Sequence, residues 1–598
     1  MTRANESATP MESARLSRRA MLRGVAAVGA SGALGALLAA CGGSSTTATN
    51  TAAPVATKPA SAATQPTAAA ASSVTGSAPT TAVASSAAVA ATSAPAATPA
   101  AAASPAASAG AVKKGGTLKA GLFGSDILSL DPLTSGAIID REIYYNIYDS
   151  LVAIDVNAQI MPALAEKWET PDPKTYIFHL RQGVKFHDGT DFNGDAVKFN
   201  IMRYLTDPKS LRKSEIDTIA SVDVMDPYTV KFTLKSAFAP LLATLVDRAG
   251  MMLSPTTVQA LGPDGVVQKP VGAGTGAFKF VEWIKNDHIT VDRNPNYWKK
   301  DASGTQLPYL DKIIYRPIAD TTVLLTNAKT GDVDTMYSIA GKDVAAVKSG
   351  NDLVFKDAPG IGFSSFQFNA AKEPFNKKEF RQAFAEALDR DQILKTVNFG
   401  VGQAGQGPIQ PSSWAYDPNF KPYGGNIDKA KQYLQAGGSP GGFSCELLIA
   451  SGSPTTTQLA QLVKDQMAKV GIIVTIKQEE GATQSADQMS GNFQIVPFGW
   501  SGRIDPDGNI YNNFHTGGGL NYGKYSNPQA DDLMEKARAA GDQAQRKDLY
   551  QQAQKLLVDD APHAFYYFSP NYLITQPKVQ GMQLYPDYMM RFDVASLK

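Results

Sequence analysis

The chain has 598 residues, with 56 Lys and Arg against 55 Asp and Glu, so its net charge at pH 7 is +1. Because the charges balance, bulk charge indicates neither nucleic-acid binding nor attraction to an anionic membrane surface, and we expect no nucleic-acid partner. Two cysteines are too few for a disulfide framework.

The first 41 residues have the order of an export signal. Residues 17–23 (SRRAMLR) contain a twin-arginine pattern, and a mildly apolar run follows at 24–40. This run is short and contains glycine, so it would make a poor permanent membrane helix, although a membrane stub is the alternative. It ends at 38–41 (LAAC), which resembles the lipobox of bacterial lipoproteins. The sequence therefore predicts export by the Tat route, a lipid anchor on Cys41, and a place in the periplasm or on the outer face of the cell membrane.

Residues 42–112 consist of Ala, Thr, Ser, Pro and Val with almost no charge and no aromatic residue. Such a segment buries too little apolar area to offset its ordering entropy, so we predict a disordered tether. The roughly 480 residues that follow are enough for at least two lobes. If Cys41 carries lipid, Cys445 has no partner, and we expect a buried thiol and no internal disulfide.

The first half of the folded part is strand-rich. A β-like run opens it at 116–122, and apolar and polar residues alternate at 176–180 and again at 230–234. Alternation with a period of two is typical of strands that bury one face. We therefore predict a mixed and strand-rich first half.

The second half shows helical periodicity. Apolar residues fall on one helix face over 378–394 and over 459–470, where Gly471 stands at the position of a C-cap. An apolar run at 472–476 follows at once, and a helix that leads into a buried strand is typical of an α/β unit with a parallel sheet. Two more helices are predicted, one that begins at Asn527-Pro528 and one that ends before Pro562.

One stretch of the second half, residues 498–509 (FGWSGRIDPDGN), combines an indole, a guanidinium, carboxylates and glycines in a turn-prone segment that follows an apolar run. A loop at the end of a buried strand is a usual place for a ligand site. The alternative is that Trp500 is a core aromatic residue and that Asp505 and Asp507 only shape the turn.

The residues resemble one family in order and spacing. The motifs are AEKW at 165–168, YIFHLRQGVKFHDG at 176–189, GTGAF at 274–278, RNPNYW at 293–298, GDVD at 331–334, RQAF at 381–384 with DR at 389–390, DKAK at 428–431 and DAP at 560–562. Together they resemble the extracellular solute-binding proteins of ABC importers, family 5, of the peptide, oligopeptide and nickel type. The resemblance covers about residues 115–590.

This resemblance implies an α/β, type II (class C) periplasmic binding protein with two lobes and a hinge. Lobe I would comprise 115–317 plus 569–598, with an extra strand-rich subdomain at about 155–268, and lobe II would comprise 318–568. The implied function is to capture a peptide or peptide-like solute between the lobes and deliver it to the membrane permease. The partners are then the solute, the permease subunits and, through the lipid, the membrane, and we expect a monomer.

The resemblance also names ligand-binding residues. In peptide binders of this family, the segment similar to 498–509 supplies an aspartate that pairs with the α-ammonium of the peptide. This chain keeps Gly499, Trp500, Ser501 and Gly502 but continues with Arg503, which suits a carboxylate or phosphate, unless Asp505 takes the older role. The arginine that clamps a dipeptide's C-terminus is also missing near 453–455. We expect Arg503 to face an anionic or hydroxyl-rich group and Trp500 to form a stacking wall.

Further candidates are Trp414 and Tyr416 in a loop that often approaches the ligand in this family, Asn521 and Tyr522 in a glycine-rich segment that could close over the ligand, and Phe363 on the floor of the site. Each has a structural alternative as a surface, loop or core residue. The ligand thus stays open among a peptide, an oligosaccharide, an anionic solute and a metal chelate, and a sensory role stays open beside transport.

An enzyme is not expected. Residues 499–503 lack the last glycine of a nucleophile elbow, and the five histidines show no ligand spacing, so we predict no catalytic residues, no metal site and no cofactor. The glycine-rich 272–276 precedes a strand, not a helix, and 505–510 lacks the glycine that a calcium loop needs at its sixth position.

Overall fold

The computed structural model describes residues 112–598. The predicted signal peptide, the lipidation at Cys41 and the tether up to residue 111 lie outside the described residues. No helix of the described part is both long enough and apolar enough to cross a membrane.

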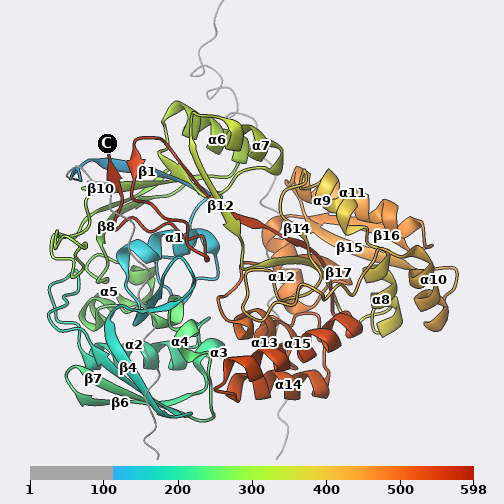
Figure 1. Cartoon of the computed structure of the whole chain (residues 1–598), viewed down its shortest axis with the longest axis horizontal. Helices are drawn as coiled ribbons and strands as arrows, with labels where there is room; N and C mark the ends of the chain where they lie inside the picture. Colours follow the sequence, from blue (N-terminus) through green and yellow to red (C-terminus); the bar gives the residue numbers. More distant parts are fainter. Residues whose placement is uncertain (1–111) are drawn as a thin grey trace, which may run out of the picture. The chain divides into compact units, whose positions relative to one another are not determined.

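A seven-stranded sheet organises what we call lobe I (Figure 1). Its strands, in spatial order, are β12 (Val354–Pro359), β19 (Pro570–Thr575), β11 (Thr335–Met336), β1 (Thr117–Phe123), β10 (Lys312–Ile318), β9 (His288–Arg293) and β8 (Phe278–Ile284). β1 runs parallel to β10 and β11, and the other pairings are antiparallel. Leu118, Ala120 and Leu122 alternate along β1 and are fully buried in one core with α1 (Ile138–Ile147), as expected for a strand with one face in the core.

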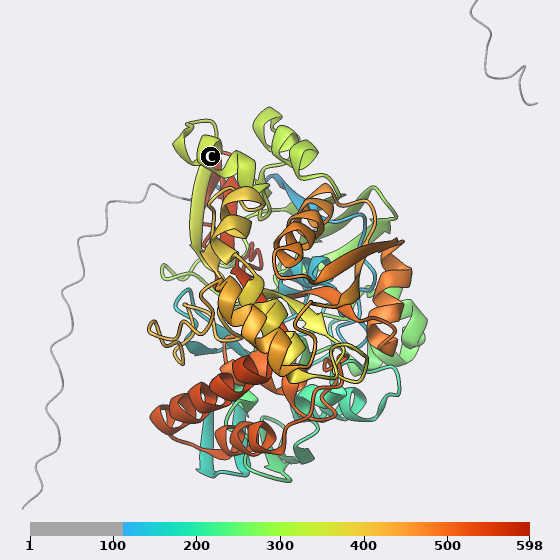
Figure 2. The same cartoon turned by 90° about the vertical axis from the view of Figure 1, so that its right-hand side faces the viewer.

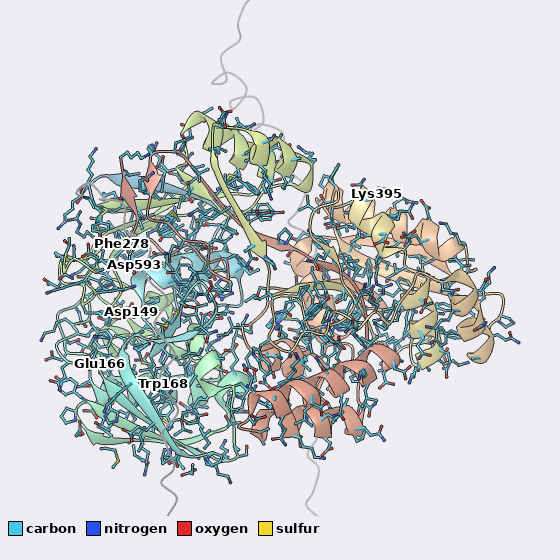
Figure 3. The ribbon with its side chains drawn as sticks, viewed as in Figure 1. Asp149, Glu166, Trp168, Phe278, Lys395 and Asp593 are labelled. Carbon is cyan, nitrogen blue, oxygen red and sulfur yellow. The ribbon has the colours of Figure 1, made fainter. Side chains whose placement is uncertain are left out.

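A separate antiparallel sheet of four strands lies within lobe I. Its order is β4 (Ala165–Asp172), β5 (Thr175–Leu180), β7 (Thr229–Leu234) and β6 (Ile219–Asp226), with α2 (Gly194–Thr206) packed against it. The strands predicted at 176–180 and 230–234 are confirmed as β5 and β7. Glu166 and Trp168, from the first motif of the resemblance, lie on β4 (Figure 3). All four strands fall inside the expected strand-rich segment 155–268.

Lobe I contains further short strands and helices. They are β2 (Val152–Ile154), β3 (Ile160–Pro162), β20 (Val579–Gln580), β21 (Ser596–Leu597), α3 (Lys213–Ile216), α4 (Leu241–Thr244), the 3-10 helix η1 (Arg248–Gly250), α5 (Pro255–Gln268), α6 (Thr321–Thr330) and α7 (Gly341–Ser349). Asp149, labelled in Figure 3, is half-buried and accepts hydrogen bonds from Tyr297 (3.1 Å), Trp298 (2.9 Å) and Thr275 (3.0 Å). Two of its partners belong to the motif at 293–298, so that motif stabilises the lobe.

Lobe II is built on a six-stranded sheet. The strand order is β14 (Gln403–Ala404), β18 (His563–Phe568), β13 (Phe363–Phe368), β17 (Ile495–Trp500), β15 (Ser444–Ala450) and β16 (Ile473–Glu479). β15 runs parallel to both β16 and β17, which confirms the α/β unit with a parallel sheet. Its helices are α8 (Lys378–Ala387), α9 (Arg390–Thr396), α10 (Ile427–Ala436), α11 (Pro454–Ala468), α12 (Gly481–Ser490), α13 (Pro506–Phe514), α14 (Pro528–Ala539) and α15 (Gln543–Asp560). Figure 2 shows α14 and α15 side by side.

One helix prediction needs correction. The segment 378–394 is not a single helix, because α8 ends at Ala387 and α9 begins at Arg390. The side chain of Asp389 accepts a hydrogen bond from the backbone N–H of Gln392 (2.8 Å) and so caps α9. The apolar periodicity continues across the break, and periodicity alone does not reveal a cap in the middle of a run.

The chain passes between the two sheets twice, at residues 360–362 and at Ser569. Our expected boundary at 318 assigned β11 and β12 to lobe II, whereas both strands pair within the lobe I sheet, so the first crossing lies about 40 residues later. The two crossings are adjacent, since a Cβ on Gly360 would overlap the carbonyl oxygen of Ser569. Likewise, a Cβ on Gly362 would overlap the carbonyl of Trp500, and one on Gly502 that of Ile361. The loop after β17 therefore rests directly on the first crossing.

Close backbone packing at the crossings gives a testable prediction. We expect Gly360→Ala to lower the free energy of unfolding by about 1–3 kcal/mol, because the new methyl group forces the crossing segments apart. Chemical denaturation measures the change. Gly481→Ala is the matched control: its Cβ would meet no atom within 4 Å in the described structure, and alanine is the better helix former. Equal stabilities of the two variants would contradict the close contact.

Candidate ligand-binding site

Asn509 fixes the loop that follows β17. Its side-chain oxygen accepts hydrogen bonds from the indole of Trp500 (2.9 Å) and the backbone N–H of Arg503 (2.7 Å), and its amide donates to the carbonyl of Arg503 (3.0 Å). Asn509 is 1% exposed, so these three hydrogen bonds are made away from solvent. The sequence placed Asn509 in the candidate segment 498–509, but no role was predicted for it.

The guanidinium of Arg503 lies 4.8 Å from the ring centroid of Trp500, so the indole stacks on the arginine and orients it. Nη1 of Arg503 also donates to the Gly502 carbonyl (2.7 Å), and Ser501 Oγ is 3.5 Å away. Gly499 is the exposed residue just before the last residue of β17, Trp500. The structure thus brings Gly499, Trp500, Ser501 and Arg503 together. Of these four residues, Arg503 is the one that faces lobe I.

Arg503 meets a cluster of charged residues from lobe I. Its Nε lies 3.5 Å from Oδ2 of Asp247, which immediately precedes η1. Asp247 is also approached by Nε of Arg141 on α1 (3.2 Å) and by Nε of Arg248 (3.8 Å). A fourth guanidinium, Arg212, precedes α3 and pairs with Glu215 (2.7 Å). We call Arg141, Arg212, Arg248 and Arg503 the arginine cluster.

Positive charge exceeds negative charge in this cluster. Within residues 112–598, its four guanidinium groups form ion pairs with only two carboxylates, Asp247 and Glu215, so these ion-paired groups carry a net charge of +2. The buried carboxyl of Asp140, whose pKa burial raises, is also within the field of Arg248, but it hydrogen-bonds to Ser135 (2.6 Å) and to the backbone N–H of Leu128 (2.8 Å). Burial alone would raise the pKa of Asp247, but Arg141, Arg248, Arg503 and Arg212 outweigh it and hold that pKa well below its usual range. Burial lowers the pKa of Arg503, which the attraction of Asp247 partly offsets. Asp247 is therefore ionised, and the cluster attracts further anions.

Glu142, next to Arg141 on α1, does not neutralise the excess. Burial raises the pKa of Glu142 to about 8, and its Oε2 accepts a hydrogen bond from the backbone N–H of Met590 (2.8 Å). The carboxyl is therefore mainly protonated at pH 7. Asp587 and Arg591 nearby pair with each other at 2.7 Å and add no net charge.

The raised pKa of Glu142 predicts how stability depends on pH. The unfolded carboxyl ionises near its ordinary pKa of 4.5, whereas the folded one stays protonated up to about 8, so stability is lost as pH rises between these values. The slope is about 1.4 kcal/mol per pH unit for this group. We expect Glu142→Gln to gain stability relative to the native chain from pH 5 to 8 and to keep a constant difference above that. Thermal unfolding across this range measures it, and parallel curves would contradict the assignment.

Asp505 and Asp507 belong to a second, neutral cluster. Asp505 accepts two hydrogen bonds from Arg546 (2.9 and 2.7 Å) and caps α13, while Asp507 lies 3.2 Å from Arg538. Burial raises the pKa of Asp507 to about 6, with Arg538 acting against it. The Arg538 guanidinium lies between Tyr511 (3.6 Å to the centroid) and Phe238 of lobe I (4.6 Å). Each carboxylate of this pair thus has an arginine partner.

The loop that carries Trp414 and Tyr416 lies beside this neutral cluster. Arg546 is 5.2 Å from the ring of Trp414, which also packs on Tyr550 (6.3 Å between centroids). Ser412 of the same loop donates a hydrogen bond to the carbonyl of Gly360 at the first crossing (2.7 Å). Trp414 and Tyr416 are half-buried against the lobe II core. The loop is adjacent to the crossing and to Asp505, but not paired with Arg503.

The remaining candidates lie elsewhere. The side chain of Phe363 is 2% exposed and contacts Phe498, Phe514 and Phe565 inside the lobe II core. Asn521 hydrogen-bonds within its own loop to His515 (3.1 Å) and Tyr525 (2.7 Å). Tyr522 packs on Leu448, Phe493 and Val496, near the opposite end of β17 from Trp500. The structure does not bring these three side chains to Arg503. Gly519 of the same segment does approach lobe I, since its Cβ would lie 3.8 Å from Ser214 Oγ.

Sequence reasoning missed Arg141, Arg212, Asp247 and Arg248. A signal was present at 241–253 (LLATLVDRAGMML), where one acid and one base interrupt an apolar run. Charged residues inside such a run are buried only when they are paired, which indicates a buried ionic site. The same holds for 138–143 (IIDREI), the start of α1. Residues 112–598 contain no group of three or more His, Cys, Asp or Glu residues with the geometry of a metal site.

Comparison with known proteins identifies the family. Residues 159–522 match the sequence profile of the bacterial extracellular solute-binding proteins, family 5 (middle region). The chain belongs to this family. The glutathione-binding protein GsiB of Pectobacterium atrosepticum is 28% identical over 487 residues, which cover 79% of this chain and 93% of that protein. Proteins of this kind are solute-binding components of ABC importers and not enzymes, and the chain is accordingly a binding protein.

Solved structures show the same fold. The DppA periplasmic binding protein of Helicobacter pylori, in complex with the peptide STSA, has a TM-score of 0.73 and 28% identity, and the match covers 81% of this chain and 98% of that one. AgaA from A. tumefacien R10, in complex with agropinic acid, also gives 0.73 and 28%, covering 81% and 99%. The predicted type II periplasmic binding fold is confirmed.

Proposed function

We propose that this protein is the exported, lipid-anchored substrate-binding component of an ABC importer and that it captures an anionic, peptide-like solute at Arg503. The solute lies between Arg503 of lobe II and the arginines of lobe I, and the closed protein delivers it to the permease. The observation that carries the anionic solute is the net charge of +2 on the ion-paired groups of the arginine cluster.

The neutral cluster supports the same choice. A short peptide with both termini paired needs a free carboxylate for its α-ammonium, but Asp505 and Asp507 already pair with Arg546 and Arg538. Releasing Asp505 would leave Arg546 buried without its strongest partner, which is costly. We therefore place Asp505 in support of the loop, and Arg503 with Trp500 at the ligand.

Export and anchoring rest on the sequence of the first 41 residues. The twin-arginine pattern at 17–23 directs the folded chain to the Tat route, and Cys41 receives the lipid. Labelling of the cells with radioactive palmitate tests the anchor: the native chain takes up label, and Cys41→Ala does not. Equal labelling of both would reject Cys41 as the lipid site.

Identification of the guest tests the function. The mature protein is extracted gently from its own host, its intact mass is measured under native conditions, and any bound guest is then released by denaturation and identified. An acid or acidic peptide supports the proposal, and a neutral sugar, a cationic peptide or a metal chelate overturns its anionic part. Deletion of the gene in cells fed the labelled guest separates transport from sensing, because only loss of transport abolishes uptake.

A further inference from the structure

We propose that Arg212 and Arg248 form a second anion subsite, so that the ligand carries at least two carboxylates. This inference rests on the proposed function and deepens it, because it names the ligand as a dicarboxylate. One carboxylate pairs with Arg503 at the junction of the lobes, and the other binds the Arg212–Arg248 pair inside lobe I.

The two guanidinium groups converge on a neutral atom. Nη2 of Arg212 donates to the carbonyl oxygen of Ser135 at 3.2 Å, and Nη1 of Arg248 donates to the same oxygen at 3.0 Å. Two cations that share one oxygen acceptor repel each other, and a carbonyl carries no charge to offset that repulsion. The pair thus forms a preorganised fork that suits a carboxylate.

Donor capacity remains at this pair. Arg212 and Arg248 are each 4% exposed, and within residues 112–598 the Nε of each is buried without a hydrogen-bond partner. Buried donors are normally satisfied, and an orphaned one requires an explanation. Glu215 neutralises only one of the two charges, at Nη1 of Arg212 (2.7 Å). Burial lowers the pKa of Arg212 to about 10, and the positive charges of Arg248 and Arg503 add to this, whereas Glu215 opposes it.

The other two arginines serve a different carboxylate. Arg141 and Arg503 both approach Asp247, at 3.2 and 3.5 Å, so this half of the cluster already contains one internal negative charge. Arg248 lies between the halves, 3.8 Å from Asp247 and 3.0 Å from Ser135. Each half thus holds two arginines and one acidic residue that pairs with them, which leaves one unpaired guanidinium charge in each half. Asp140 lies beside the second half, but its carboxyl accepts hydrogen bonds from Ser135 and Leu128 and pairs with neither Arg212 nor Arg248 among the described residues. One ligand carboxylate in each half would pair with the charge left there.

The test compares diacids with their monoesters by isothermal titration calorimetry on the full mature chain. The probe pairs are glutathione with its glycyl monoethyl ester and glutarate with its monomethyl ester. We expect each diacid to bind at least 10-fold tighter than its monoester. Arg212→Gln and Arg248→Gln should each reduce this ratio to near one while monoester binding is kept, which also shows that the variants fold. Lys213→Gln removes one exposed charge at the next position and should leave the ratio unchanged.

Each result decides between the two proposals. A ratio that stays the same in both arginine variants, or a native chain that binds monoester and diacid equally, overturns the second subsite but leaves the anionic solute standing. If no probe binds, the carboxyl groups of the guest released from the native protein are counted by methyl esterification. Two or more support the subsite, one overturns it alone, and none overturns the proposed function with it.

Discussion

Replacing Asp505 with asparagine is expected to lower the free energy of unfolding by about 3–5 kcal/mol, since it breaks a buried ion pair from one side. The carboxylate makes two hydrogen bonds to Arg546, at 2.9 and 2.7 Å, and a third to the backbone of Asp507 at 3.0 Å. Asparagine preserves the helix cap but leaves the guanidinium of Arg546, only 8% exposed, without its charge partner. We therefore expect the substitution to lower the free energy of unfolding more than it lowers the affinity for the ligand.

Urea denaturation of the native chain and of Asp505→Asn measures this loss. Asp532→Asn is the matched control, because Asp532 pairs with Lys536 at the surface with both side chains more than half exposed, and such pairs contribute about 0.5 kcal/mol or less. Adding Arg546→Gln to Asp505→Asn should recover part of the loss, because no buried charge is then left alone. A loss as small as that of the control would show that Asp505 is free to bind a ligand ammonium.

Local sequence patterns predicted elements well where one face of the element packs against one core. The alternation at 230–234 produced β7, and the apolar run at 472–476 lies at the start of β16. Lobe boundaries were harder, because they depend on which distant strands pair. Among the described strands β12 pairs with β19 alone, more than 200 residues later, and no local pattern encodes that pairing.

The candidate site was predicted only in its lobe II half. Arg503 stood out because an arginine occupies the position at which peptide binders of this family are expected to have an aspartate. The lobe I half is assembled from Arg141, Arg212, Asp247 and Arg248, which are up to 107 residues apart and meet only through tertiary folding. Conversely, Phe363 looked like a floor residue from its place in the chain, but alternation along β13 turns its ring into the core. The position of Phe363 in the chain indicated its segment, but not the direction in which its side chain points.

Replacing Arg503 with glutamine is expected to weaken binding of an anionic solute by about 2–5 kcal/mol, or roughly 30- to 5,000-fold, the cost of truncating one partner of a buried charge pair. The other three arginines belong to lobe I, so among the described members of the cluster only Arg503 links the ligand to lobe II. Closure is favoured by contacts that exist only when a ligand bridges both lobes. Loss of Arg503 should therefore reduce both affinity and ligand-induced closure.

Calorimetry with the identified solute, together with small-angle scattering to follow closure, measures both effects. Arg503→Lys should fall between the native chain and Arg503→Gln, because lysine keeps the charge but loses the planar fork that stacks on Trp500. Lys524→Gln, an exposed charge change in the same lobe, is the control and should bind like the native chain. Unchanged affinity in Arg503→Gln would show that lobe I alone binds the anionic group of the solute. The ligand would then bind to lobe I before closure and independently of it, and scattering would show no effect of the substitution on closure.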